Sequence, residues 1–437
     1  MTSGTFWRRP LTPRFVAAAS VIAAIGFALT FYWVVWLVGR YFYVPFSNDG
    51  DVPLFQQYAD RIFGAYLPYR DFTFLYPPGA LPAFVVPAWL AGTSINADRY
   101  RVALQGLMVV CGAVMAILSV VTLSRVTDRR REVLIGGALL VAAPAVLGWT
   151  VVLRYDLWPA ALTAATMLCV VLARYRIGAV FLGLAILAKV YPIVLVPLLA
   201  AYAWRNAGRR EAVLFVGITA GVIALVFAPF LLYDGTGFIG ALAKAFDRSL
   251  QVESLGAAIL FVLHAVAGQH ITVQFGGGSH NLVGRLPDMA IDIQTYALVV
   301  LLLILWVRFA RGPADARTLV LAAAGAVAIY VGLGRVLSDQ YVIWLIPLVA
   351  MVPWSAARLA APGLIAILAL SNWIYPGEYA GFEREFLPGP AWVVLIRVVA
   401  ILVLGLYLAR RGAAAAEVDE EPSSPAPERD GPLEHKN

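Results

Sequence analysis

The sequence predicts an all-α polytopic membrane protein with about 12 helical membrane segments. Three observations predict it: 61% of the 437 residues are hydrophobic, only 14% are charged, and the apolar runs are long and end in arginines. A soluble protein of this size could not bury so much apolar surface. Strands of a membrane barrel would alternate in segments of about ten residues, so continuous runs indicate helices.

The apolar runs divide into about ten full spans and one interrupted pair. The full spans are expected near 15–40, 101–124, 133–153, 157–174, 211–233, 293–309, 318–334, 341–355, 360–375 and 391–410. Residues 177–204 are too short for two spans, yet both of their flanks are basic. We therefore predict a broken hairpin of two short helices, interrupted around Lys189-Val190-Tyr191-Pro192, with no matching interruption in the second half.

Charge then orients the chain. The positive-inside rule places the arginine clusters and both termini in the cytoplasm. We expect one membrane domain over residues 1–411, followed by a cytoplasmic tail, 412–437, whose Ala-, Glu-, Pro- and Ser-rich composition predicts disorder. Only three of the 33 basic residues are lysine, which suggests a bacterial genome rich in GC and hence a bacterial plasma membrane.

Two large polar interruptions become outer regions, at about 41–99 and 234–292. The first contains a predicted amphipathic helix, which should lie at the bilayer interface. Its apolar face would carry Leu54, Phe55, Tyr58, Ile62 and Phe63, and its polar face Gln56, Gln57, Asp60 and Arg61. Residues 78–92 are apolar but short and contain three prolines, so we predict a second interfacial helix there. The second region should hold a short helix at about 254–268.

Several classes of function find no support. The net charge of +7 comes from arginines that flank the spans, so it is no sign of nucleic-acid binding. Cys111 and Cys169 fall in apolar runs, and the four histidines lack ligand spacing, so we predict neither a metal nor another cofactor. The run Gly276–Gly278 lacks a following Gly-Lys-Ser/Thr and is predicted to be a flexible loop.

Unusual polar residues collect on the predicted outer face. Asp49 and Asp51 open the first outer region, and either carboxylate is a candidate general base. Asp51 has a plainer alternative, because Asp before a helix start is a preferred N-cap. Candidates for substrate binding are Arg70, Tyr76, Arg154, Asp156, Lys189, Arg248, Arg335, Gln340 and Tyr341. Lys189 is equally a candidate for a buried counter-ion and for a phosphate ligand.

Four segments, in this order and spacing, resemble the polytopic GT-C glycosyltransferases, most closely bacterial glycosyltransferase family 87. They are DVPLFQQYADRI with PYRDF and YPPG in the first outer region, RYDLWPAAL at 154–162, GLAILAKVYPIVLVP at 183–197 and SDQYVIWLIPL at 338–348. LQVESLGAAI at 250–259 is weaker support. In one departure, Asp339 replaces the proline of a segment that often reads Ser-Pro-Gln-Tyr in the family.

The resemblance implies a GT-C-like fold and a sugar transfer. Mannose would pass from a polyprenyl-phosphate donor to a glycolipid, polysaccharide or protein acceptor at the outer face, by one inverting displacement. An acid of the first outer loop would be the base, and the match before Val-Pro favours Asp51 over Asp49. Arginines would stabilise the leaving phosphate, Arg335 first, then Arg154, with Arg248 and Lys189 behind them.

Two alternatives stay open. A transporter or lipid flippase would also have many spans and a broken helix, although it needs no large one-sided outer region. Within the enzyme class, arabinofuranose is the second candidate sugar.

Overall fold

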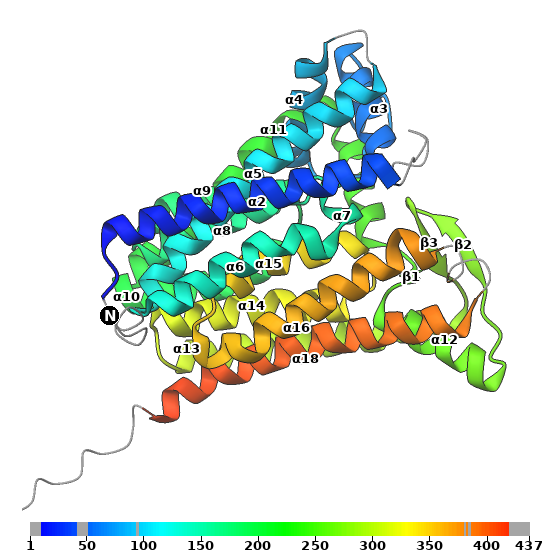
Figure 1. The fold of residues 1–437 in the computed structure, drawn as a ribbon. Coiled ribbons are helices and arrows are strands. Elements are labelled where there is room, and N and C mark those ends of the chain that lie inside the picture. The colour runs from blue at the N-terminus through cyan, green and yellow to red at the C-terminus, as the bar shows by residue number, and fades with distance from the viewer. Residues whose placement is uncertain (1–9, 42–50, 93–95, 380–381, 383–385, 419–437) are drawn as a thin grey trace, which may run out of the picture.

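The structure is a computed structural model that describes residues 10–41, 51–92, 96–379, 382 and 386–418. The described helices run roughly side by side in an elongated bundle, with a small sheet and short helices at one end (Figure 1). Asp49 lies outside the described residues, and so do parts of both termini.

Seven of the described helices are long and apolar enough to cross a membrane. They are α2 (Pro13–Tyr41), α5 (Ala97–Val126), α11 (Arg209–Phe246), α13 (Arg285–Arg311), α14 (Ala316–Leu333), α16 (Trp354–Asn372) and α18 (Pro388–Val418). The prediction of a polytopic, mainly α-helical membrane protein is thereby confirmed, while the total of about 12 segments stays a prediction. Helix α18 continues past residue 411, where we expected the membrane domain to end.

Shorter helices fill the bundle between these seven. They are α6 (Arg130–Leu147), α7 (Trp149–Val152), α8 (Leu157–Val171), α9 (Tyr175–Ala188), η3 (Tyr191–Leu195), α10 (Val196–Ala207), η4 (Asp339–Trp344), α15 (Leu345–Ala350) and η5 (Trp373–Glu378). The structure has the predicted broken hairpin, because α9 ends just before Lys189 and the 3₁₀ turn η3 leads into α10. Pro192 and Pro197 stand in the first turns of η3 and α10, where a missing N–H is tolerated.

The prediction that the second half has no matching interruption is wrong. The 3₁₀ turn η4 leads directly into the short helix α15, as η3 leads into α10. In both segments a charged residue is followed two positions later by tyrosine and eight positions later by proline. The rings of Tyr191 and Trp344 stack with their centroids 4.2 Å apart, so the two segments meet inside the bundle.

One end of the bundle is basic. Arg130 donates to the carbonyl of Pro10 over 3.3 Å, and Arg317 donates to Ser355 over 3.3 Å, so these contacts join neighbouring helix ends. The arginines at or beside these helix ends include Arg125, Arg129, Arg130, Arg131, Arg176, Arg205, Arg209, Arg210, Arg308, Arg311, Arg317, Arg358, Arg410 and Arg411. This is the end near the N label in Figure 1.

The opposite end carries the short elements. They are α3 (Val52–Phe63), η2 (Pro78–Ala80), α4 (Leu81–Ala91), α12 (Leu255–Ala267) and strands β1 (Leu250–Gln251), β2 (Val273–Gly276) and β3 (Ser279–Leu282). The strands form an antiparallel sheet in the order β1-β3-β2, in which Leu250 and Val273 both pair with Leu282. The sequence did not predict this sheet, and the expected flexible loop Gly276–Gly278 belongs to its hairpin, where Gly277 and Gly278 have positive φ angles.

The first of the short helices, α3, packs on protein. The Phe55 ring stacks on Phe84 at 4.4 Å, and Tyr58 lies edge-on to Phe74 at 4.8 Å. Gln56 was assigned to the wrong face, because its side chain is buried, while Phe63 is 44% exposed. The apolar face therefore covers the chain's own aromatic residues, which leaves less of it free for lipid than an interfacial helix would present.

Candidate active site

The Asp51 carboxylate points to a buried arginine. Asp51 is the residue before α3, yet its side chain makes no capping hydrogen bond. Its Oδ2 lies 2.5 Å from Nη1 of Arg154 instead. The Asp51 side chain is 32% exposed and that of Arg154 only 7%, so the carboxylate is the accessible partner. This geometry speaks against a plain N-cap role and leaves one carboxylate edge open to a substrate.

Arg154 also contacts a second acid. Its Nη2 lies 3.7 Å from Oδ1 of Asp339, which is 2% exposed. The other oxygen of Asp339 accepts a hydrogen bond from Thr150 Oγ1 at 2.5 Å. The Arg154 guanidinium lies over the Tyr375 ring, 5.3 Å from its centroid. Asp339 stands where the segment quoted above often has proline. Its contact helps to fix Arg154, which in turn contacts Asp51.

A glycine lets the chain reach this position. Gly148, between α6 and α7, has a φ of +63°, a conformation that residues with a Cβ rarely adopt. A Cβ there would also lie 2.5 Å from Oδ1 of Asn372. The turn at Gly148 directs α7 and the following Arg154-Tyr155-Asp156 turn across the end of α16.

The third charged pair of the site is Lys189 with Asp156. Lys189 Nζ lies 2.7 Å from Oδ1 of Asp156, and Trp344 Nε1 donates to the same oxygen at 2.7 Å. The ammonium also lies 4.7 Å from the ring centroid of Tyr155, 5.2 Å from that of Tyr341 and 5.3 Å from that of Trp344. Burial raises the pKa of the Asp156 carboxyl, and the Lys189 ammonium opposes that rise. Because its surroundings already satisfy Lys189, the geometry favours the counter-ion role over phosphate binding.

Aromatic rings surround the Asp51 end of the cluster. Tyr76 lies edge-on to Tyr155 at 5.3 Å and to Phe55 at 5.8 Å. Burial first, and the Asp51 charge second, raise the pKa of Tyr76 well above its usual range, so its hydroxyl stays protonated. Phe55 and Tyr155 are buried, so the half-buried Tyr76 is the ring of these three that a polar ligand at Asp51 can contact.

Further cations lie on the neighbouring segments. Arg335 follows α14 and is half-buried, and within the described residues its guanidinium makes no hydrogen bond or ion pair. Arg248 donates to Ser279 Oγ at 2.5 Å and lies close enough to Tyr341 for its charge to act on that phenol. Gln340 is buried and accepts a hydrogen bond from Ser338. The guanidinium N–H groups of Arg335 are therefore available to bind a ligand.

Arg70 is a sequence candidate that lies apart from the cluster. Arg70 pairs with its exposed neighbour Asp71 at 2.9 Å, and none of its contacts in the described chain reaches Asp51 or Arg154. Asp49 lies outside the described residues, so its candidacy as the base stays a prediction.

Several residues of the site were not predicted from the sequence. Thr150, Trp344 and Tyr375 are single polar or aromatic residues in apolar runs, and only their contacts mark them. Arg397 is different, because an ionisable residue in the middle of a span is itself a signal. Its side chain is fully buried and pairs with Glu253 at 2.8 Å.

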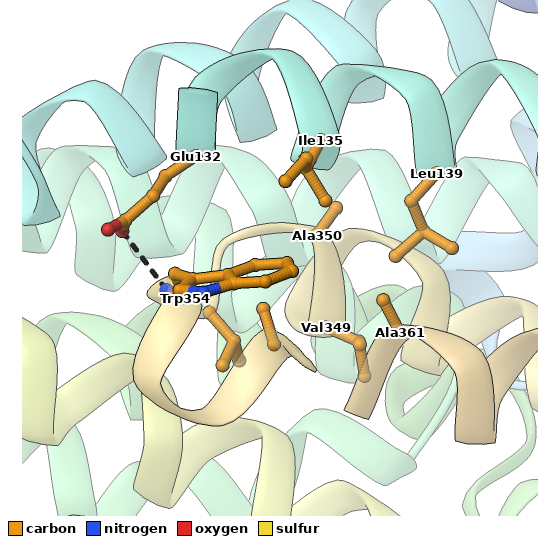
Figure 2. A pocket seen from close by; sticks show the side chains of 10 residues that line it. Glu132, Ile135, Leu139, Val349, Ala350, Trp354 and Ala361 are labelled. Carbon is orange, nitrogen blue, oxygen red and sulfur yellow. Dashed lines mark hydrogen bonds between the residues drawn. The ribbon is translucent and has the colours of Figure 1, made fainter. Parts of the chain in front are cut away.

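The bundle's basic end has a small apolar pocket of its own. Glu132, Ile135, Val349 and Trp354 help to line it, and Glu132 accepts a hydrogen bond from the backbone of Trp354 at 3.0 Å (Figure 2). Its lining contains one carboxylate and no cation. Among the described residues, no group of three or more His, Cys, Asp or Glu side chains is placed to hold a metal ion. The acid–arginine cluster around Asp51 and Arg154 is the candidate active site because it joins an accessible carboxylate to a buried arginine.

A comparison with family models gives a match over the middle of the chain. The model described as Glycosyltransferase family 87 matches residues 74–331, which is more than half of the chain. The matched range includes Arg154, Asp156, Lys189 and Arg248, while Asp51 precedes it. No curated protein matches the chain.

Proposed function

Since the chain belongs to glycosyltransferase family 87, we propose that it moves a sugar from a polyprenyl-phosphate donor to a glycolipid or polysaccharide acceptor in the bacterial plasma membrane. Mannose is the first candidate sugar. The observation that carries the proposal is the cluster in which buried Arg154 joins the accessible carboxylate of Asp51 to Asp339. Such a cluster offers a base and positive charge side by side.

In the proposed reaction Asp51 is the general base. The acceptor oxygen attacks the anomeric carbon of the donor sugar while Asp51 takes the proton of the acceptor hydroxyl. The bond between that carbon and the phosphate oxygen breaks, and polyprenyl phosphate leaves with the electron pair. One displacement of this kind inverts the anomeric centre.

The growing charge on the leaving phosphate needs a cation. Arg335 is the first candidate because its donors are free among the described residues, and Arg248 is the second. Arg154 is committed to two carboxylates, so its first task is to orient Asp51. Hydrogen bonds from ionised donors to phosphate are about twice as strong as neutral ones, which suits a guanidinium to this role.

The orientation follows from the charges at the two ends. The positive-inside rule assigns the basic end, and with it both termini, to the cytoplasm. Asp51 and Arg154 lie at the opposite end, which would then be the outer face. A lipid-linked sugar could reach the site there from the outer leaflet.

A transporter or flippase is the competing proposal. The second interrupted segment, at η4 and α15, removes one argument against it, because paired broken helices are frequent in transporters. Membership in a glycosyltransferase family supports the transferase.

The purified protein, assayed with a panel of labelled donors, tests the proposal. The panel contains polyprenyl-phosphate mannose, polyprenyl-phosphate arabinofuranose and GDP-mannose, with a bacterial glycolipid extract or polysaccharide as acceptor. We expect transfer from a lipid-phosphate sugar and none from the nucleotide sugar. Transfer from GDP-mannose would contradict the donor class. Flipping of labelled lipid in proteoliposomes, without transfer from any donor, would favour the transporter.

A further inference from the structure

Arg397 is a fully buried charge in the first half of α18. Its Nη1 lies 2.8 Å from Oε2 of Glu253, whose side chain is 2% exposed. Apart from this ion pair, the three guanidinium nitrogens have no hydrogen-bond partner in the part of the chain that the structure describes. Burying such a pair costs more desolvation energy than an apolar contact would, so its presence calls for a reason beyond stability.

Hydrogen bonds connect Glu253, the partner of Arg397 on α18, to the candidate site. Its backbone N–H donates to Oε1 of Gln251 at 3.0 Å, and the same oxygen accepts from the N–H of Leu337 at 3.3 Å. The N–H of Gln251 donates to the carbonyl of Arg335 at 3.0 Å. Gln251 therefore ties two backbone positions of the segment 335–339 to the residue that Arg397 anchors.

That segment carries two groups of the site. Arg335 is its first residue and Asp339 its last, and Asp339 contacts Arg154. Burial raises the pKa of Glu253, and Arg397 opposes the rise while the nearby Asp339 charge adds to it. Arg397 thus neutralises an acid that would otherwise repel Asp339.

We propose that Arg397 and Glu253 are positioning residues for sugar transfer, because through Gln251 they hold Arg335 and Asp339 in place from the far side of the site. The α12 and β1 labels lie at the end of the bundle that carries the short elements (Figure 1), and α12 packs against both α18 and β1. The inference rests on the proposed function, since the segment matters only if Arg335 meets the donor phosphate.

Three variants separate positioning from stability. Arg397→Met leaves Glu253 buried without a counter-ion and is expected to lower the melting temperature. Glu253→Gln with Arg397→Met removes both charges, which is often neutral for stability, so the melting temperature should recover. Arg358→Met is the matched control, because Arg358 is an exposed arginine on another span.

The double variant gives the decisive result. We expect its KM for the lipid-phosphate donor to be about tenfold above the wild-type value while its melting temperature is normal. The reason is that the ion pair which fixes Glu253, the neighbour of Gln251, is lost. Hydrogen exchange should also be faster at the Leu337 amide, which donates to Gln251. Wild-type donor KM and wild-type protection of Leu337 in the double variant would overturn the proposal.

Failure of the proposed function would look different. If the wild type uses no lipid-phosphate sugar at all, the donor assignment fails and KM is not measurable. Hydrogen exchange at the Leu337 amide then tests the positioning role by itself, since this measurement needs no substrate. Unchanged protection of Leu337 in the folded double variant would overturn the positioning role.

Discussion

Replacement of Asp51 by asparagine is expected to slow sugar transfer by about a thousandfold, within the range that loss of a general base produces. Asparagine keeps the shape of the side chain and can still meet Arg154, but it cannot accept the proton of the acceptor hydroxyl. Initial rates with labelled lipid-phosphate sugar, at saturating donor, measure the effect. Detergent size-exclusion profiles show whether the variant is folded.

Two companion variants sharpen this result. Asp60→Asn removes an exposed carboxylate from the same helix and should leave the rate unchanged. Asp49→Asn tests the other acid of the first outer region. If Asp49→Asn abolishes transfer and Asp51→Asn does not, the base is Asp49 and the assignment made from the Arg154 contact is wrong.

Replacement of Arg154 by glutamine should damage both activity and stability. It leaves Asp51 and the buried Asp339 without their common counter-ion. Breaking a buried ion pair on one side costs about 3–5 kcal/mol, and removing a charged donor from an active site costs about 100- to 1,000-fold in rate. Thermal unfolding followed by tryptophan fluorescence and the transfer assay measure the two effects.

An exposed ion pair supplies the control for Arg154. Arg176 lies 2.6 Å from Glu211 at the basic end, and its side chain is 60% exposed. Arg176→Gln should leave the melting temperature close to that of the wild type, because water screens such a pair. Equal effects of the Arg154 and Arg176 substitutions would show that the Arg154 cluster has no special role.

The bundle was predictable because lipid imposes long apolar helices, whose ends the arginines mark. The break at Lys189 was also predictable, because one segment was too short for two spans and had basic flanks. The sheet was not, since its strands are two to four residues long and lack an apolar alternation. Gln56 was placed on the exposed polar face of its helix, because periodicity shows which residues share a face but not whether that face meets lipid, water or neighbouring aromatic rings.

The candidate residues were predictable as a set, but their pairings were not. Acids and arginines stand out in an apolar chain, so Asp51, Arg154, Asp156 and Lys189 could be chosen from the sequence. Asp51 and Asp339 are far apart in the chain, and only the fold brings both to Arg154. The same holds for Lys189, whose contacts with Asp156 and three aromatic rings favour the counter-ion role.

Photolabelling tests most directly that lipid phosphate binds at this cluster. A polyprenyl-phosphate analogue with a diazirine beside the phosphate would be irradiated with the protein in nanodiscs, and the labelled peptides mapped by mass spectrometry. The proposed mechanism predicts adducts near Arg154, Arg248 and Arg335 that excess polyprenyl-phosphate mannose suppresses. Competed adducts confined to the basic end, around Arg125 and Arg317, would contradict it.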